Sequence, residues 1–182
     1  MILKLAVSAD GKIAAGVGQR TAITGAAVKA RVHLLRAQCD AILVGMGTVL
    51  VDDPELTCRL PGLENRSPKP FVLSRDRELP PSSRLAQAGA TVLHGSVAAA
   101  LGELGQRGIN RLLVEGGAMT ARSFLDASMV DEVQIFRSPD CIGAGGVEAL
   151  AGLDLESALQ PFALREEERL GPDRLTVYET RN

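Results

Sequence analysis

Aromatic residues are scarce in this sequence. Phenylalanine, tyrosine and tryptophan make up 3% of the 182 residues, and tryptophan does not occur. The formal net charge is −2 at pH 7, so lysine and arginine are not in excess. Proteins that bind nucleic acids need basic surfaces, and those that bind single strands also stack bases on aromatic rings. We therefore expect no nucleic-acid partner.

Long hydrophobic runs and paired cysteines are also missing. No apolar run approaches the roughly 20 residues that cross a bilayer, and the apolar start of the chain is too short for a secretion signal. Cys39, Cys58 and Cys141 are odd in number, without a C-x-x-C pair or a histidine at metal-ligand spacing. The sequence predicts a cytoplasmic protein with free thiols, no membrane partner and no metal site.

The apolar residues predict one α/β domain. With 46% apolar residues, a chain of this length can bury one core, so we expect residues 1–182 to form a single domain. Short apolar runs alternate with helical periodicity, which favours a largely parallel sheet. The predicted strands are 2–7, 41–44, 71–74, 91–94, 111–115 and 133–136, and the predicted helices are 26–38 with Thr24 as its N-cap, 97–106, and a third that begins at 118 to 120 and ends at 126 to 127.

The end of the chain departs from this alternation. Residues 162–170 and 174–180 flank Gly171-Pro172-Asp173, a strong turn signal. We expect them to form an antiparallel hairpin, which makes the sheet mixed and mostly parallel. Such an ending does not suit a doubly wound nucleotide-binding fold.

The run Leu113-Val114-Glu115-Gly116-Gly117, with the helix expected after it, is the most informative segment. A strand that ends in glycines and opens a helix presents free backbone N–H groups to an anion. The run predicts a cradle for a nucleotide phosphate, although a plain strand-to-helix turn fits it equally well. Neither G-x-G-x-x-G nor G-x-x-x-x-G-K-[ST] is present.

A second segment follows the strand predicted at 41–44. There, Gly45 and Gly47 would bring a cofactor close to the backbone, and Thr48 offers a hydroxyl to a phosphate or an amide. Asp53 precedes a proline and is the expected turn former, which leaves Asp52 to face a pocket. The alternative is that both carboxylates cap solvated turns.

Four basic residues are candidates for binding charged groups. Arg36 and Arg59 would clamp a phosphate monoester if the first helix packs beside the loop after Asp52. Arg75, at a strand end, would bind a 2′-phosphate, and Lys12 would reach a sugar or a carbonyl oxygen. A solvated surface position is the alternative for each, and for the arginine pair it is the commoner case.

Five segments occur in a characteristic order. They are 4–12 (KLAVSADGK), 34–37 (LLRA), 47–57 (GTVLVDDPELT) with Arg59, 114–117 (VEGG) and 130–132 (VDE). This pattern spans most of the chain and resembles the riboflavin-biosynthesis pyrimidine reductases. These form the reductase half of the bifunctional diaminohydroxyphosphoribosylaminopyrimidine deaminase/reductase.

The resemblance implies a dihydrofolate-reductase-like three-layer fold, paired subunits, and NADPH-dependent reduction of 5-amino-6-(5-phosphoribosylamino)uracil to 5-amino-6-(5-phosphoribitylamino)uracil. The alternatives are a reductase of the same fold acting on the diaminopyrimidinone precursor or another small substrate, and a silent nucleotide-binding domain. The zinc signature of a deaminase, H-x-E with P-C-x-x-C, is missing. We therefore expect either a single-function enzyme or a domain fused to, or acting with, a deaminase.

The same resemblance implies residue roles. Substrate contacts fall on Arg36, Leu56, Arg59 and Glu115. The proton that opens the sugar ring would come from Glu115, Asp52 or Lys12, and a partly buried carboxylate with a raised pKa suits this role. The implied cofactor contacts are Ala6, Thr48, Asp52, Arg75, Gly117, Ala118, Met119, Thr120, Ala121, Arg122 and Ser123. Where many members have a serine, a tryptophan and an aspartate, this chain has Arg20, Ala22 and Ser74.

Overall fold

The computed structural model describes residues 1–181, which form a sheet covered by helices. Its strands are β1 (Ile2–Val7), β2 (Lys12–Ala14), β3 (Ala41–Gly45), β4 (Lys69–Ser74), β5 (Thr91–His94), β6 (Leu112–Val114), β7 (Glu132–Arg137), β8 (Val147–Glu148), β9 (Phe162–Leu170) and β10 (Asp173–Thr180). Its helices are α1 (Ala26–Ala37), α2 (Met46–Asp52), the 3₁₀ helix η1 (Glu64–Arg66), α3 (Arg84–Gln87), α4 (Val97–Gln106), α5 (Ala118–Asp126) and α6 (Leu155–Leu159).

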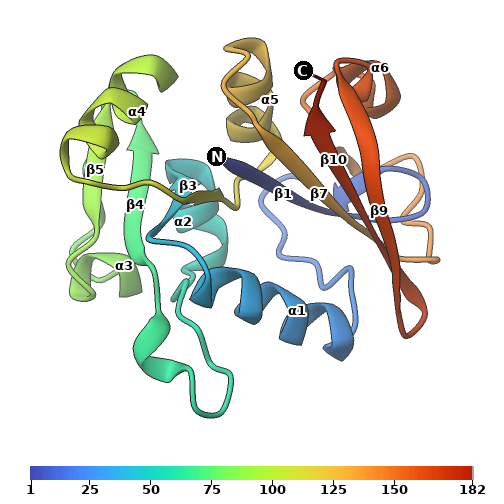
Figure 1. Ribbon diagram of the computed structural model, residues 1–182, viewed down its shortest axis with the longest axis horizontal. Helices are drawn as coiled ribbons and strands as arrows, with labels where there is room; N and C mark the ends of the chain where they lie inside the picture. Colours follow the sequence, from blue (N-terminus) through green and yellow to red (C-terminus); the bar gives the residue numbers. More distant parts are fainter. Residues whose placement is uncertain (182) are drawn as a thin grey trace.

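Eight strands form the main sheet, in the order β5-β4-β3-β6-β1-β7-β10-β9. Figure 1 shows β5 at one edge and β9 at the other. The strands from β5 to β7 pair in parallel, and β10 runs antiparallel to both β7 and β9. The predicted mixed sheet with a C-terminal hairpin is confirmed. In a separate two-stranded sheet, β2 pairs with β8.

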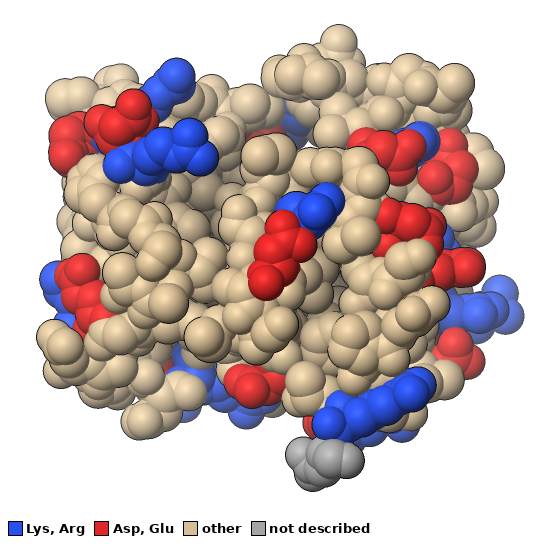
Figure 2. Space-filling model, turned by 90° about the horizontal axis from the view of Figure 1, so that it is seen from above, with Lys and Arg blue, Asp and Glu red and all other residues tan. Residues whose placement is uncertain are grey.

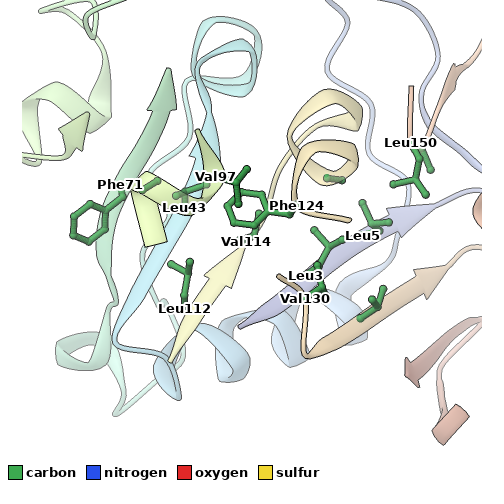
Figure 3. Close-up of a cluster of buried hydrophobic side chains, with 14 of the residues drawn as sticks. Leu3, Leu5, Leu43, Phe71, Val97, Leu112, Val114, Phe124, Val130 and Leu150 are labelled. Atoms are coloured by element: carbon green, nitrogen blue, oxygen red, sulfur yellow. The ribbon is translucent and has the colours of Figure 1, made fainter. Parts of the chain in front are cut away.

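Alternation along the strands sends side chains to two opposite faces of the sheet. Leu3 of β1 and Leu43 of β3 pack on one face, in a cluster with Phe124 of α5. Ile42 of β3 packs on the other face with Leu35 of α1. Figure 3 shows the first cluster, with α5 lying over the strands. The result is three layers, helix on sheet on helix, as the resemblance implied.

Two local predictions were wrong. The N-cap of α1 is Gly25 rather than Thr24, and its N–H donates to the Asp173 carboxylate at 2.8 Å. This contact comes from the first residue of β10 and has no local signal. Residues 46–52 form helix α2. The sequence did not predict this helix, because its glycine and β-branched residues disfavour helical structure. Burial of Met46 and Val49 in the core stabilises it instead.

Charges are mixed on the face of the molecule seen from above. Figure 2 shows acidic and basic side chains lying beside one another there. Within residues 1–181, no helix is long and apolar enough to cross a membrane. The same residues contain no group of three or more His, Cys, Asp or Glu arranged to hold a metal ion.

Candidate active site

Two cavities open at the end of the main sheet where its parallel strands have their carboxyl ends. Ala6 of β1, Val44 of β3 and Glu115 after β6 line the first cavity, whose volume is about 350 Å³. The starts of α2 and α5 line the second, of about 480 Å³. Ligands of open α/β sheets bind at the carboxyl ends of the strands, so this end of the sheet is the expected place for a site.

The two cavities share a wall. The residues that line both are Ile13, Arg20, Thr48, Asp52 and Gly117. A ligand in one cavity can therefore approach a ligand in the other across Thr48 and Asp52. This arrangement suits a reaction between two bound molecules, because it holds their reacting atoms close together.

Charged side chains dominate the first cavity. At its base, Arg36 donates from Nε and Nη2 to the two oxygens of Glu115, at 2.8 and 3.1 Å, and from Nη1 to the Thr57 carbonyl at 3.0 Å. The Lys4 ammonium lies 3.6 Å from the same carboxylate. The Glu115 and Arg36 side chains are only 9% and 12% exposed. The pair is thus a buried, bidentate ion pair.

The protonation of Glu115 follows from these contacts. Burial by itself raises the pKa of Glu115, but the charges of Lys4 and Arg36 and their hydrogen bonds lower it further, and the net pKa lies below the ordinary value. Glu115 is therefore ionised at neutral pH and can accept hydrogen bonds but not donate a proton. The raised pKa that would suit a proton donor is therefore not found at Glu115.

Asp52, the last residue of α2, has the opposite tendency. It is half-buried in the shared wall, and burial raises its pKa while the charge of Arg20 lowers it less strongly. Asp53 adopts a left-handed conformation (φ 39°) and ends the helix. Asp53 thus forms the turn and Asp52 faces the pocket, as predicted, but Asp53 lines the first cavity as well.

Lys12, the third candidate for the proton, lies elsewhere. Its ammonium group forms an ion pair with Glu148 across the small β2–β8 sheet. Its side chain packs so closely on Gly146 that a Cβ at that position would lie 2.7 Å from Lys12 Cγ. In the described part of the chain, Lys12 is outside the lining of both cavities.

The remaining predicted substrate residues line the first cavity. Leu56 is buried with a φ of 57°, an uncommon conformation for a bulky residue. Arg59 follows on the same loop, and its backbone N–H donates to His33 Nδ1 at 3.2 Å. Burial, together with the charges of Arg36 and Arg59, lowers the pKa of His33, which suits a neutral acceptor. Arg36 and Arg59 thus meet at one cavity.

The second cavity is lined in part by glycines and by the start of a helix. Gly47 of α2 faces open space where a Cβ would be, as judged from the described residues. Gly117 is the N-cap of α5, and its N-cap position leaves the first N–H groups of the helix free for an anion. Gly45 lines this cavity too, and a Cβ there would lie 2.1 Å from Thr120 Oγ1, so this glycine also makes room for that side chain.

The predicted cofactor residues fall into two groups. Thr48, Asp52, Gly117, Ala118, Met119 and Thr120 line the second cavity, and Ala6 lines the first. Four others lie outside both linings as far as residues 1–181 show. Ala121 is buried in the core, Arg122 pairs with Asp126, Ser123 donates to the Met119 carbonyl, and Arg75 is exposed after β4.

Sequence reasoning missed several lining residues. Arg84, at the start of α3, reaches the first cavity from 25 residues beyond Arg59. Residues 13, 14 and 16–21, at and beyond β2, line the second cavity. No local pattern distinguishes these residues from surface positions, and only Arg20 differs from the serine that many members of the resembled family have.

Comparisons with known proteins identify the family. The model of the RibD C-terminal domain matches residues 1–175. This chain belongs to the RibD C-terminal domain family. A 2,5-diamino-6-ribosylamino-4(3H)-pyrimidinone 5′-phosphate reductase from Methanothermobacter thermautotrophicus is 31% identical, over 98% of this chain and 96% of that protein. The riboflavin biosynthesis protein RibD of Mycobacterium tuberculosis is 35% identical over 94% of this chain and 52% of its own length.

Solved structures in this family have the same fold. RibD from Acinetobacter baumannii superposes with a TM-score of 0.86 at 25% identity, covering 100% of this chain and 58% of that one. A deaminase/5-amino-6-(5-phosphoribosylamino)uracil reductase from Thermotoga maritima gives 0.83 at 31% identity, over 99% of this chain and 56% of that one. The chain thus spans about half the length of its RibD relatives. The family and fold predicted from the sequence are confirmed.

Proposed function

We propose that this RibD-type domain is an oxidoreductase that uses NADPH to reduce 5-amino-6-(5-phosphoribosylamino)uracil to 5-amino-6-(5-phosphoribitylamino)uracil. The observation that supports it best is the pair of adjoining cavities. One is charged, as a phosphorylated sugar requires, and the other is lined by glycine and a helix N-terminus, as a dinucleotide requires. The shared wall brings their contents together.

A second substrate deserves equal testing. The Methanothermobacter relative, which this chain matches over almost its whole length, is named for reduction of the 2,5-diamino pyrimidinone. That molecule differs from the uracil in the pyrimidine ring and has the same phosphorylated sugar. We propose it as the alternative substrate of the same site.

The second cavity is the proposed site of NADPH. Gly47, Thr48 and the start of α5 at Gly117–Thr120 fit a dinucleotide, since they offer open backbone and free N–H groups. Arg75 is proposed to contact the 2′-phosphate from outside the cavity lining. If so, Arg75→Ala weakens NADPH binding and leaves NADH binding unchanged, as fluorescence titration would show.

The chain's own residues supply orientation and a proton. NADPH, when bound, supplies a hydride to the sugar C1′. Opening the ribosylamine ring breaks the bond from C1′ to the ring oxygen, forms a C=N bond with the amino nitrogen and places a proton on the oxygen. Asp52 in the shared wall is the proposed donor, because Glu115 is ionised and Lys12 lies apart. Glu115 is left to accept hydrogen bonds from the substrate.

The first experiment is NADPH oxidation at 340 nm with each pyrimidine, for the wild type and Arg59→Ala. We expect turnover with one pyrimidine and a large loss in the variant. Tight NADPH binding without turnover of either pyrimidine would instead favour a silent nucleotide-binding domain.

Three further proposals concern the extent of the domain, the pairing of two chains and a deaminase domain. We propose that residues 1–182 act as one reductase domain, that two copies pair, and that a deaminase domain, fused or separate, supplies the substrate. Sedimentation velocity tests the pairing: a single species with the mass of one chain at micromolar concentration would contradict it.

A further inference from the structure

Arg84 reaches the rim of the first cavity from the start of α3. It is the first residue of α3, and its backbone N–H donates to Asp53 Oδ1 at 2.8 Å. Its side chain donates from Nη1 to Glu55 Oε1 at 2.9 Å, and its Nε lies 3.6 Å from Asp53 Oδ2. The contacts with the loop after α2 therefore fix both the start of the helix and its arginine.

Arg59 is bound to the other oxygen of the same carboxylate. Its Nη1 donates to Glu55 Oε2 at 2.8 Å and to Thr57 Oγ1 at 3.2 Å. Glu55 thus holds one guanidinium on each oxygen, so the two positive groups lie side by side. The Arg59 and Arg84 side chains are 55% and 58% exposed. Ion pairs this exposed contribute little to stability.

The donors left over point to an anion. Arg36 uses Nε, Nη1 and Nη2 on Glu115 and the Thr57 carbonyl. By contrast, Arg59 makes its hydrogen bonds to described residues through Nη1 and keeps Nε and Nη2 free, and Arg84 keeps Nη2 free. Guanidinium donors in a fork match the oxygens of a phosphate. Among the described residues, the free guanidinium donors at this cavity belong to Arg59 and Arg84 at the rim and to Arg20 in the wall shared with the second cavity.

The charges of the cavity lining divide between a buried cluster and the exposed rim. The lining contains five cations, Lys4, Arg20, Arg36, Arg59 and Arg84, against four anions, Asp52, Asp53, Glu55 and Glu115. Lys4 and Arg36 are engaged by the buried Glu115, so the one excess positive charge lies in this cluster. At the rim, Asp53 and Glu55 balance Arg59 and Arg84, so a phosphate would be bound there through free guanidinium donors rather than through a net positive charge.

We propose that Arg84 is the second guanidinium of a phosphate clamp with Arg59, and that Glu55 positions both for the 5′-phosphate of the substrate. The inference rests on the proposed function and deepens it, since it assigns the phosphate to the rim formed by α3 and the loop after α2. Arg36 then serves the substrate chiefly by holding Glu115.

The test compares Arg84→Ala and Arg84→Gln with the wild type on the phosphorylated and the dephosphorylated ribosylaminopyrimidine. A hydrogen bond to a charged group is worth about 1.5–3 kcal/mol, or roughly 10- to 100-fold. We expect KM for the phosphorylated substrate to rise by about that factor, with kcat unchanged, and less than about twofold change with the dephosphorylated one. Arg84→Lys should recover part of the loss. The matched control is Arg174→Ala, which removes an exposed arginine paired with Glu167 on the distant hairpin.

Binding of ribose 5-phosphate, measured by calorimetry, separates failure of this inference from failure of the proposed function. If neither pyrimidine is reduced, the proposed function fails, while weaker ribose 5-phosphate binding by both Arg84 variants still supports the clamp. The clamp is overturned if the wild type does not bind ribose 5-phosphate. It is also overturned if the variants bind it as the wild type does, or lose activity equally on both substrates.

Discussion

Asp52 and Glu115 are carboxylates of one cavity with opposite proton affinities. Burial raises the pKa of Asp52, which has only the exposed Arg20 nearby to oppose it. Glu115 is more deeply buried, yet two basic residues hold it in the ionised form. Environments that drive two pKa values apart are how one site obtains a proton donor and a fixed negative charge.

Replacing Asp52 tests the first role. For Asp52→Asn we expect kcat to fall by about 10²-fold or more, the usual contribution of a general acid. Since the acid works in its protonated form, wild-type activity should fall as the pH rises through the raised pKa of Asp52. Rate profiles recorded from about pH 4 upward check this, and the limb should be absent in the variant. Retention of the limb would remove Asp52 from the role.

Replacing Glu115 tests the second. Glu115→Ala leaves Arg36 and Lys4 without their buried partner, so we expect a loss of about 3–5 kcal/mol in the free energy of unfolding. Urea denaturation measures it. Glu103→Ala, which breaks an exposed pair with Arg107, should cost about 0.5 kcal/mol or less. A small change in the free energy of unfolding for Glu115→Ala would contradict a buried ion pair between Arg36 and Glu115.

The lowered pKa of Glu115 also predicts how the stability of the protein changes with pH. The pKa of Glu115 is lowered on folding, so its contribution is present above the unfolded value of about 4.3 and is lost as the pH falls through the folded value. Wild-type stability should therefore fall more steeply than that of Glu115→Ala below about pH 4.3. Parallel slopes would contradict the lowered pKa.

At the scale of elements, α5 fits against the start of α2 through one side chain. A Cβ on Gly45 would lie 2.1 Å from Thr120 Oγ1, and one on Gly116 would lie 2.6 Å from Thr120 Cβ. Both glycines thus let α5 approach the strand ends β3 and β6 closely. The helix start that we propose for the cofactor phosphate is positioned by this contact.

Gly45→Ala should therefore cost about 1–3 kcal/mol in unfolding free energy, the usual price of overpacking, and weaken NADPH binding. Thr120→Ala in the same chain should relieve most of the stability loss, because the remaining Cβ lies at an acceptable 3.4 Å. The control is Gly102→Ala in α4, where the described residues leave open space and we expect a gain of about 0.5–1 kcal/mol. If Gly45→Ala and Gly102→Ala changed the free energy of unfolding equally, the packing argument would be refuted.

At the scale of the whole molecule, the second cavity joins distant parts of the chain. Its walls come from residues 13–21, from α2 and the end of β3, and from the start of α5. A ligand bound there holds these segments together and stabilises only the folded state. At about 100 times its dissociation constant, NADPH should raise the free energy of unfolding by about 2.7 kcal/mol without any pyrimidine present. An unchanged denaturation midpoint with saturating NADPH would contradict a dinucleotide site.

The local pattern was sufficient for much of the fold. Strands such as β1 and β5 and helix α4 could be predicted because apolar periodicity and turn residues act over a few neighbours. Helix α2 could not, since its glycine and β-branched residues disfavour it locally and only burial of Met46 and Val49 holds it. The N-cap of α1 depends on Asp173, 148 residues away.

The candidate site divides in the same way. The sequence alone determined the family, the mixed sheet and many of the residues from which the site is drawn, because these depend on residue type, order and short-range spacing. Only the tertiary structure decided which of them meet and added Arg84 to them: Lys4 and Arg36 hold Glu115 in its ionised form, Lys12 pairs with Glu148, and Arg84 lies beside Arg59. Burial and the distance between charges fix these outcomes, and both depend on segments that are far apart in the chain.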